Sequence, residues 1–401
     1  MIGTSSAGRA GIAASAGVFI AALLAFLAIG AALPVLPSFV RGPLHAGDVA
    51  VGVVVGAFAL TAVVCRPLAG RRADRRGRRG VLVGGALAMS LGGGLYLLST
   101  GVPSLILGRL VVGAGEGAVY TAGATWAVDL APRDRQGLAL GLFGLAVWGG
   151  LSLGPLAGEL LRTSSGYDAV WILTAALPLA GAAIATRIPE PARGSGIDRP
   201  QPALLPRAAR RPGAALALAN IGYAALAGFV VLHLHARGIA GGATVFTAFA
   251  IAVFTSRLAL SRVPDRAGAT PTATVAGLLE ATGLVVIALA GSLPVALLGA
   301  VIVGAGFSML FPSLALMVVG EVGEDSRGTA LGAFTAFFDL GVGLGGPLAG
   351  ATAALAGYPA VFYLSAAAAL CTAWLAATAQ RTDDGSLRDP VPSRAAQHAP
   401  T

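Results

Sequence analysis

The chain has 401 residues, of which 56% are hydrophobic and only 11% are charged, and its mean hydropathy is +0.81. This composition excludes an ordinary soluble domain, because such domains carry about 25% charged residues and cannot hide so much apolar surface from water. The net charge of +9 comes entirely from arginine. Those arginines lie between apolar runs, which indicates membrane topology rather than nucleic-acid binding.

The apolar runs predict an all-α integral membrane protein, because each crossing needs about 20 mostly apolar residues. The first run, from Ile12 to Phe39, is too long for the apolar part of a signal peptide, so we interpret it as a retained span. We expect twelve transmembrane helices, at 12–40, 49–69, 80–99, 103–127, 137–161, 168–186, 213–235, 243–263, 274–292, 295–319, 328–353 and 360–379.

Arginine placement predicts the orientation. With both termini in the cytoplasm, the inner side carries Arg9, six arginines between 71 and 79, Arg133, Arg135, six between 187 and 211, Arg262, Arg266, Arg327 and three in the tail. The outer side carries only Arg41, Arg162 and Arg237. Positive loops stay inside because translocating them is costly. We therefore expect a multi-pass protein of the cytoplasmic (inner) membrane, and the exclusive use of arginine is typical of a high-GC bacterium.

Two polar segments set the expected domain limits. Residues 187–212 are rich in Pro, Gly and Arg, which is typical of a flexible cytoplasmic linker. Residues 380–401 form a polar tail that we expect to be disordered in the cytoplasm. The linker divides the chain into an N-terminal six-helix half, residues 1–186, and a C-terminal six-helix half, residues 213–379.

The two halves repeat each other in sequence. Asp74, Arg75 and Gly77 recur 191 positions later as Asp265, Arg266 and Gly268. The same shift relates further pairs, namely Arg66 to Arg257, Gly113–Gly115 to Gly304–Gly306, and Gly137, Gly141 and Phe143 to Gly328, Gly332 and Phe334. Parallel repeats related by an axis along the membrane normal place a substrate site at their interface, near the bilayer midplane. The repeat therefore predicts a transporter.

The segment GRRADRRGRRGVL, from Gly70 to Leu82, carries a family signature. It resembles the loop between the second and third helices of the major facilitator superfamily. The matching residues are Gly70, Asp74, Arg75, Gly77, Arg78 and Arg79. The resemblance implies the superfamily fold, with two pseudo-symmetric six-helix bundles, and a loop that latches the halves in the outward-facing state.

The latch is expected to work through two contacts. Asp74 is predicted to dock on the eleventh span, and Arg78 is predicted to pair with Asp129. Asp265 and Arg266 are the second copy of the loop. The alternative is a positively charged anchor without a gating role.

The fourth span carries a polar stripe. Arg109, Gly113, Glu116 and Tyr120 are spaced by four, three and four residues, which puts them on one helix face. Buried Arg and Glu each cost about 2.5–3.5 kcal/mol in a helix centre, so they need a partner or a water-filled cavity. Asp339 lies in the middle of the eleventh span, and Trp148 is its counterpart in the first half. We expect Glu116 or Asp339 to carry a proton; a structural ion pair is the alternative.

The fifth span contains G-x-x-x-G-P-x-x-G, at Gly150, Gly154, Pro155 and Gly158. Proline kinks a helix, and glycine lets another helix approach closely. The pattern resembles the antiporter motif of the exporting branches of the superfamily. Pro34 and Pro37 match the twelve-span drug:proton antiporters, and the closest branch resembles the arabinose- or sugar-efflux exporters. Asn220, Tyr223 and Trp148 are candidate substrate ligands.

These observations predict a proton-coupled exporter of a drug, sugar or secreted metabolite, working by alternating access. A multidrug-resistance role is included in that prediction. An importer or facilitator of the same fold is the alternative, and a polytopic membrane enzyme or a sensor is a weaker one. The chain lacks HExxH and phosphate-loop motifs. We expect no enzymatic activity, no metal, no cofactor other than the coupling proton, no nucleic acid, and a monomer in the bilayer.

Overall fold

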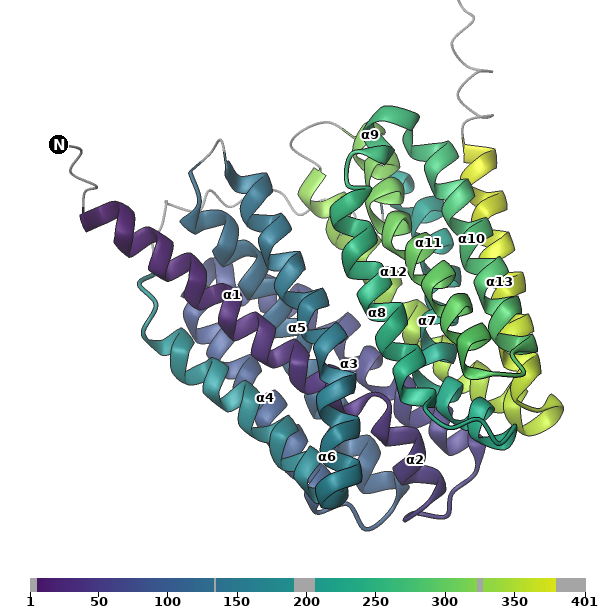
Figure 1. The fold of residues 1–401 in the computed structure, drawn as a ribbon. Coiled ribbons are helices and arrows are strands. Elements are labelled where there is room, and N and C mark those ends of the chain that lie inside the picture. Colours follow the sequence, from purple (N-terminus) through teal and green to yellow (C-terminus); the bar gives the residue numbers. More distant parts are fainter. Residues whose placement is uncertain (1–5, 133–134, 191–205, 323–326, 380–401) are drawn as a thin grey trace, which may run out of the picture.

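The computed structural model describes residues 6–132, 135–190, 206–322 and 327–379. Every element in these ranges is a helix, and Figure 1 shows two helical bundles side by side. The first half contains six helical elements: α1 (Ser6–Ala32), α2 (Val35–Arg41), α3 (Asp48–Arg76), α4 (Arg78–Leu97), α5 (Val102–Leu130) and α6 (Gln136–Thr186). The second half contains α7 (Arg207–Ala236), α8 (Gly242–Ala259), α9 (Val263–Ala267), α10 (Ala269–Leu289), α11 (Leu293–Gly320), α12 (Arg327–Ala356) and α13 (Tyr358–Ala379).

The helices account for twelve crossings of a membrane. Eleven segments of the described residues are long and apolar enough to cross, and one of them, Leu138–Thr186, is 49 residues long. That segment is two crossings, because α6 breaks at Gly166, which has φ 83° and ψ −175°. Only glycine adopts such angles without strain. The predicted all-α fold with twelve spans is confirmed, with a one-residue break where a short loop was expected between spans five and six.

The repeat seen in the sequence is also present in the backbone. Gly77 has φ 100° and ψ 156°, and its counterpart Gly268 has φ 93° and ψ 147°. A close helix contact is repeated as well. A Cβ added to Gly113 would overlap the Phe58 carbonyl oxygen, and one added to Gly304 would lie 2.6 Å from the Phe249 carbonyl oxygen. Phe58 and Phe249 are themselves 191 residues apart. The halves are therefore copies of one scaffold.

The outer helices expose apolar side chains, as a bilayer requires. Leu91, Leu160, Leu355 and Trp374 are each more than 60% exposed. They lie on α4, α6, α12 and α13. In a soluble protein such a surface would drive association, but in lipid it is the covered surface of the molecule.

The halves meet at one end and diverge at the other. Near the start of α3 and the end of α12, a Cβ on Gly56 would lie 2.8 Å from the Gly343 carbonyl oxygen, so the two backbones touch. Tyr358 Oη donates a hydrogen bond of 3.0 Å to Asp48 Oδ1 at the same end. We call this end the closed face. The other end, which carries the α3–α4 turn and α9, is called the arginine-rich face, and there the two bundles splay apart (Figure 1).

Some element boundaries differ from the sequence prediction. Helix α7 begins at Arg207, inside the segment assigned to the linker, and α8 ends at Ala259 before the short α9. The rest of the predicted linker, residues 191–205, and the predicted tail, residues 380–401, lie outside the described residues.

Candidate functional site

A central cavity lies between the two halves. It encloses about 850 Å³ of non-atom space, counted to its open mouth. Helices α1, α3, α5 and α6 of the first half and α7, α8, α11 and α12 of the second half contribute its walls. Four charged side chains line it, namely Arg66, Glu116, Arg257 and Asp339, and most of the remaining wall is aromatic or aliphatic.

Arg66 joins carboxylates from both halves of the molecule. Its Nη2 lies 3.0 Å from Glu116 Oε1 and 3.1 Å from Asp339 Oδ1, and its Nε lies 2.6 Å from Asp339 Oδ2. Arg66 and Glu116 come from α3 and α5, whereas Asp339 comes from α12. Both carboxylates are buried, at 4% and 1% exposure. The ion pair of Arg66 with Asp339 therefore connects the halves within the cavity.

Tyr120 completes this cluster. The Arg66 guanidinium carbon lies 4.5 Å from the centre of the Tyr120 ring, a cation–π distance. The ring in turn makes edge contacts with Phe26 and Phe143, at centroid distances of 6.2 and 5.6 Å. The predicted cavity residues Glu116, Tyr120 and Asp339 thus meet around Arg66, whose signal in the sequence is its place in the repeat.

Arg257, the repeat counterpart of Arg66, has a different environment. Its Nη2 donates a hydrogen bond of 3.2 Å to the Ser308 carbonyl oxygen, and its guanidinium carbon lies 5.5 Å from the Trp148 ring centre. None of the carboxylates that the structure describes forms an ion pair with it. The sequence signal for both arginines was an arginine within an apolar span, at equivalent positions of the two halves.

The structure places Arg109 away from the cavity, which corrects the prediction that it lines the cavity with Glu116. Its Nε donates to the Val54 carbonyl oxygen at 2.9 Å and its Nη2 to the Val55 carbonyl oxygen at 3.0 Å. The guanidinium carbon also lies 4.5 Å from the Phe58 ring centre. Arg109 is completely buried, and its two hydrogen bonds join α5 to α3.

Two of the three candidate substrate ligands line the cavity. Tyr223 and Trp148 are both in its wall, and Phe307 lies between them, at centroid distances of 5.8 Å from each ring. Asn220 is fully buried outside the wall, and its Nδ2 donates to the Leu216 carbonyl oxygen at 2.8 Å within the same helix. Asn220 is thus a packing residue of α7 in this conformation.

The latch loop is only partly engaged. The predicted pairing of Arg78 with Asp129 is confirmed, with Arg78 Nε 2.5 Å from Asp129 Oδ2. The predicted docking of Asp74 on the eleventh span is absent here, because the Asp74 side chain is 73% exposed and its ion partner is Arg78 at 3.9 Å. The splayed arginine-rich face separates α3 from α12 at this level.

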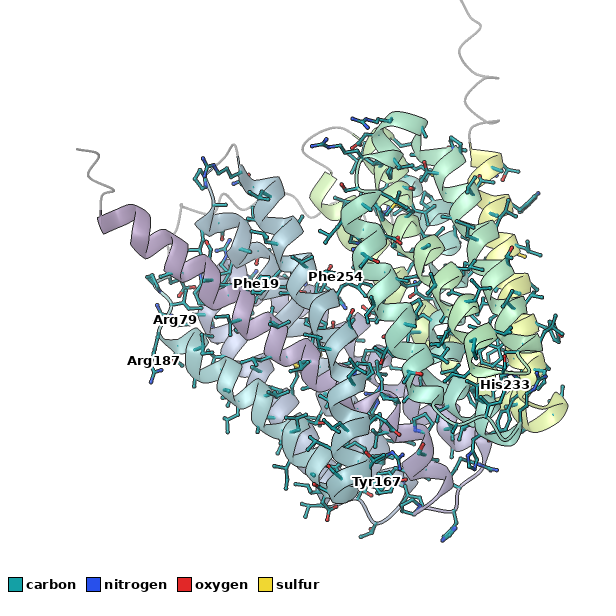
Figure 2. All side chains as sticks on the ribbon, in the orientation of Figure 1. Phe19, Arg79, Tyr167, Arg187, His233 and Phe254 are labelled. Carbon is teal, nitrogen blue, oxygen red and sulfur yellow. The ribbon has the colours of Figure 1, made fainter. Side chains whose placement is uncertain are left out.

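The other loop residues surround these contacts. Gly70 packs near Thr121, Gly77 makes the turn, and the Arg79 backbone nitrogen donates to Glu190 Oε1 at 3.3 Å. Figure 2 shows Arg79 close to Arg187, where α4 begins and α6 ends. Arg75 is exposed, and so are Asp265 and Arg266 in the second copy of the loop. Both loops therefore present charge at the arginine-rich face.

The glycine motif of the fifth span packs against the first helix. A Cβ on Gly150 would lie 2.6 Å from the Leu27 backbone nitrogen, and one on Gly154 would lie 2.6 Å from Gly30 Cα. Gly158 makes a similar contact with Ala31, and Pro155 lies inside α6. The motif thus sets the spacing of α1 and α6, which both line the cavity.

One further buried acid lies outside the cavity. Glu280 on α10 is completely buried, and neither carboxylate oxygen has a hydrogen-bond partner among the described residues. It packs beside Gly222 of α7 and Gly306 of α11. Figure 2 shows that His233 also lies within the second bundle, and its Nε2 is 3.0 Å from the Ile287 carbonyl oxygen. Neither residue contributes to the cavity wall.

Comparison with known proteins establishes the family. The sequence profile of the Major Facilitator Superfamily matches residues 18–319 and 214–400. An MFS-type transporter of Salmonella typhimurium is 36% identical over 87% of this chain and 92% of its own length. The MFS-type transporter YhhS of Escherichia coli (strain K12) is 32% identical over 87% of this chain and 88% of its own. The chain belongs to the Major Facilitator Superfamily. It is a membrane transporter and not an enzyme.

Solved structures show the same fold. A bacterial homologue of the human lysosomal transporter Spinster has a TM-score of 0.78 at 16% identity, covering 95% of this chain and 99% of its own. The nucleoside transporter NupG has a TM-score of 0.77 at 16% identity, covering 90% and 98%. The human organic anion transporter MFSD10 has a TM-score of 0.69 at 20% identity, covering 91% and 99%. Transporters of diverse cargo thus share this architecture, so the cargo has to be argued from the cavity.

Proposed function

We propose that this transporter is a proton-coupled exporter of a small organic molecule, and that Glu116 and Asp339 exchange the proton. The observation that carries the proposal is the ion pair of Arg66 with Asp339, at 2.6 Å, between the two halves. Protonation of Asp339 removes one charge of this pair and weakens an attraction that holds the halves together. The proton thereby biases the rocking motion that alternating access requires.

The direction of transport is inferred from the first-half helices and from the arginine distribution. We take the arginine-rich face as cytoplasmic, because positive loops are retained inside. The splayed arrangement then opens to the cytoplasm, and the exposed Asp74 is a latch released in this state. The glycine motif that packs α6 against α1, with Pro155 inside α6, resembles the motif of the exporting branches and supports the same direction.

The proposed cycle starts with a substrate entering the cavity from the cytoplasm while the acids are ionised. Closure of the arginine-rich face and opening of the closed face release the substrate outside. A proton then binds Glu116 or Asp339 and returns with the empty carrier. Each proton that enters with the membrane potential supplies about 2.3 kcal/mol per 100 mV, which drives export against a gradient. The substrate classes that fit are drugs, sugars and secreted metabolites.

The test is proton movement in proteoliposomes that contain the purified protein and a pH-sensitive dye. A panel of antibiotics, sugars and metabolites is added to the wild type, Glu116→Gln and Asp339→Asn. Glu280→Gln is the matched control, because Glu280 is equally buried but lies outside the cavity. We expect a substrate-dependent proton flux that Glu280→Gln retains and at least one cavity variant loses.

Two results would contradict the proposal. Substrate transport without proton movement, unchanged in both cavity variants, would indicate a facilitator of the same fold. Loss of the proton flux in Glu280→Gln alone would move the proton carrier from the cavity to α10.

A further inference from the structure

The cavity holds a guanidinium that the chain itself does not neutralise. Arg257 lines the same cavity as Arg66, but both carboxylates of the cavity wall are within 3.1 Å of Arg66. Arg257 donates a hydrogen bond from Nη2 to the Ser308 carbonyl oxygen, and its Nε has no acceptor among the described residues. A charge in such an apolar site is costly unless an anion is paired with it.

The repeat shows which carboxylates the second half lacks. Glu116 and Asp339 surround Arg66, and the residues equivalent to them around Arg257 are Phe307 and Trp148. Trp148 lies against Arg257 just as Asp339 lies against Arg66, but it offers a ring face instead of a carboxylate. A ring face attracts a guanidinium and leaves its N–H donors free for a ligand. The second half thus has an arginine prepared for an anion that must come from outside the chain.

The wall next to Arg257 favours an apolar body on that anion. Phe307 contacts Trp148 at 5.8 Å between ring centres, stacks on Tyr223 at 5.8 Å and lies 6.5 Å from Phe338. Aromatic rings of this kind bury a flat or branched apolar group well. Only the arginines and the carboxylates contribute charge to the cavity wall.

We propose that the substrate is a zwitterion with an apolar body, whose carboxylate binds Arg257 and whose amine lies beside Glu116 and Asp339. The carboxylate half follows from Arg257, since a guanidinium binds a carboxylate through two parallel hydrogen bonds. The amine half rests on the proposed proton exchange. A bound anion without an amine would favour protonation of Glu116 and Asp339, so the anion and the proton would bind together. Exchange requires a group that competes with the proton, and a cationic amine does so.

The test compares matched probes on the purified full-length protein. Phenylalanine carries both charges, phenethylamine lacks the carboxylate, and 3-phenylpropionate lacks the amine. Tryptophan, tryptamine and indole-3-propionate form a second set with a larger body. Binding is measured by thermal stabilisation and by the release or uptake of protons. The variants are Arg257→Gln and Arg257→Lys, with Arg262→Gln as control, because Arg262 is exposed beyond the end of the same helix.

We expect the zwitterion of at least one set to bind about tenfold more tightly than its amine or acid and to release protons on binding. Arg257→Gln should weaken binding of the zwitterion about tenfold while leaving the amine unchanged, Arg257→Lys should restore part of it, and Arg262→Gln should have no effect.

Two outcomes overturn the inference in different ways. If the acid binds as tightly as the zwitterion, depends on Arg257 and takes up a proton, the anion site stands but proton exchange fails, and so does the proposed exporter. If no zwitterion binds at millimolar concentration, or if binding ignores Arg257, the anion site fails, while the proton exchange tested with Asp339→Asn is unaffected.

Discussion

Arg66 and Arg257 occupy equivalent positions in two copies of one scaffold, yet their surroundings are opposite. Arg66 is held by two carboxylates, one of which comes from the other half. Arg257 lies against a tryptophan and a backbone oxygen. The same backbone therefore presents a cation paired with carboxylates on one side of the cavity and, on the other, a cation without a carboxylate partner among the described residues.

Under the proposed mechanism, this difference divides the work of coupled transport between the two copies of the fold. A carboxylate that is paired within the chain can change its charge and so alter the attraction between the halves. A cation without an internal partner can recognise a ligand instead. Across the 191-residue repeat, Phe307 stands at the position equivalent to Glu116, and Trp148 stands at the position equivalent to Asp339.

The largest effect is expected for Arg66→Gln. It leaves Glu116 and Asp339 buried without their cation, and removing one partner of a buried ion pair typically costs about 3–5 kcal/mol. Arg257→Gln removes no ion pair and relieves the cost of an unpaired charge in an apolar site, so it should not destabilise the protein. Thermal unfolding in detergent measures both. Equal losses of stability for the two variants would contradict the contrast between the arginines.

A double variant can measure how strongly Arg66 and Asp339 are coupled. Arg66→Gln combined with Asp339→Asn removes the cation together with one of its two anions. Residues in one ion-pair network couple by about 0.5–3 kcal/mol, so the double variant should be more stable than the sum of the single changes predicts. If the stability losses of the two single variants simply add, the contact between Arg66 and Asp339 contributes no coupling energy.

A smaller effect, equal in the two halves, is expected at a helix contact that each half contains. Gly113→Ala and Gly304→Ala each push a methyl group into a phenylalanine carbonyl of the neighbouring helix, at Phe58 and Phe249. Overpacking of this kind costs about 1–3 kcal/mol. Gly94→Ala is the control, because no heavy atom of a neighbouring helix would lie within 4 Å of its added Cβ. Thermal melting should place both variants below this control. A loss in only one half would show that the scaffold is less symmetric than its backbone.

Much of the fold could be predicted from the sequence because a bilayer imposes strict lengths. The twelve apolar runs and the repeat fixed both bundles, and the loop glycines Gly77 and Gly268 adopt the positive φ that their turns require. The breaks were less predictable. One glycine, Gly166, interrupts α6 where a loop was expected, because a single residue with positive φ is enough to reverse the chain direction.

The site could be predicted only in part, because its contacts join three helices. The spacing of Arg109 and Glu116 correctly puts them on one face of α5, but periodicity cannot say which neighbour each side chain meets. Arg109 turns toward the backbone carbonyl oxygens of Val54 and Val55 in α3, whereas Glu116 meets the Arg66 side chain. The ion pair between Arg66 and Asp339 spans 273 residues and depends on how the halves dock. A comparison of Trp148 with Asp339 across the repeat was the available signal.

The contrast between Arg66 and Arg257 can also be tested by giving Arg257 the carboxylate that it lacks. Trp148→Asp recreates in the second half the residue that Asp339 provides to Arg66. Trp148→Asn is the matched control, since it loses the same ring without adding a charge. We expect Trp148→Asp to bind anionic probes such as 3-phenylpropionate at least about tenfold more weakly than Trp148→Asn, because the new carboxylate competes for Arg257. Equal binding by the two variants would argue against an anion at Arg257.

The smallest effect on stability is expected at the latch, which again exists in one half only. Arg78 and Asp129 form an ion pair at 2.5 Å, and their counterparts, Ala269 and Gly320, cannot. Both side chains are partly exposed, so Arg78→Gln should cost about 0.2–1 kcal/mol at low salt and less at high salt.

Asp74→Asn should leave this state equally stable, because Asp74 is exposed. If Asp74 latches the other state, however, Asp74→Asn should slow transport while binding from the cytoplasmic side is retained. Cysteine accessibility at the closed face would measure that shift, and unchanged accessibility with unchanged transport would reduce the loop to a positive anchor.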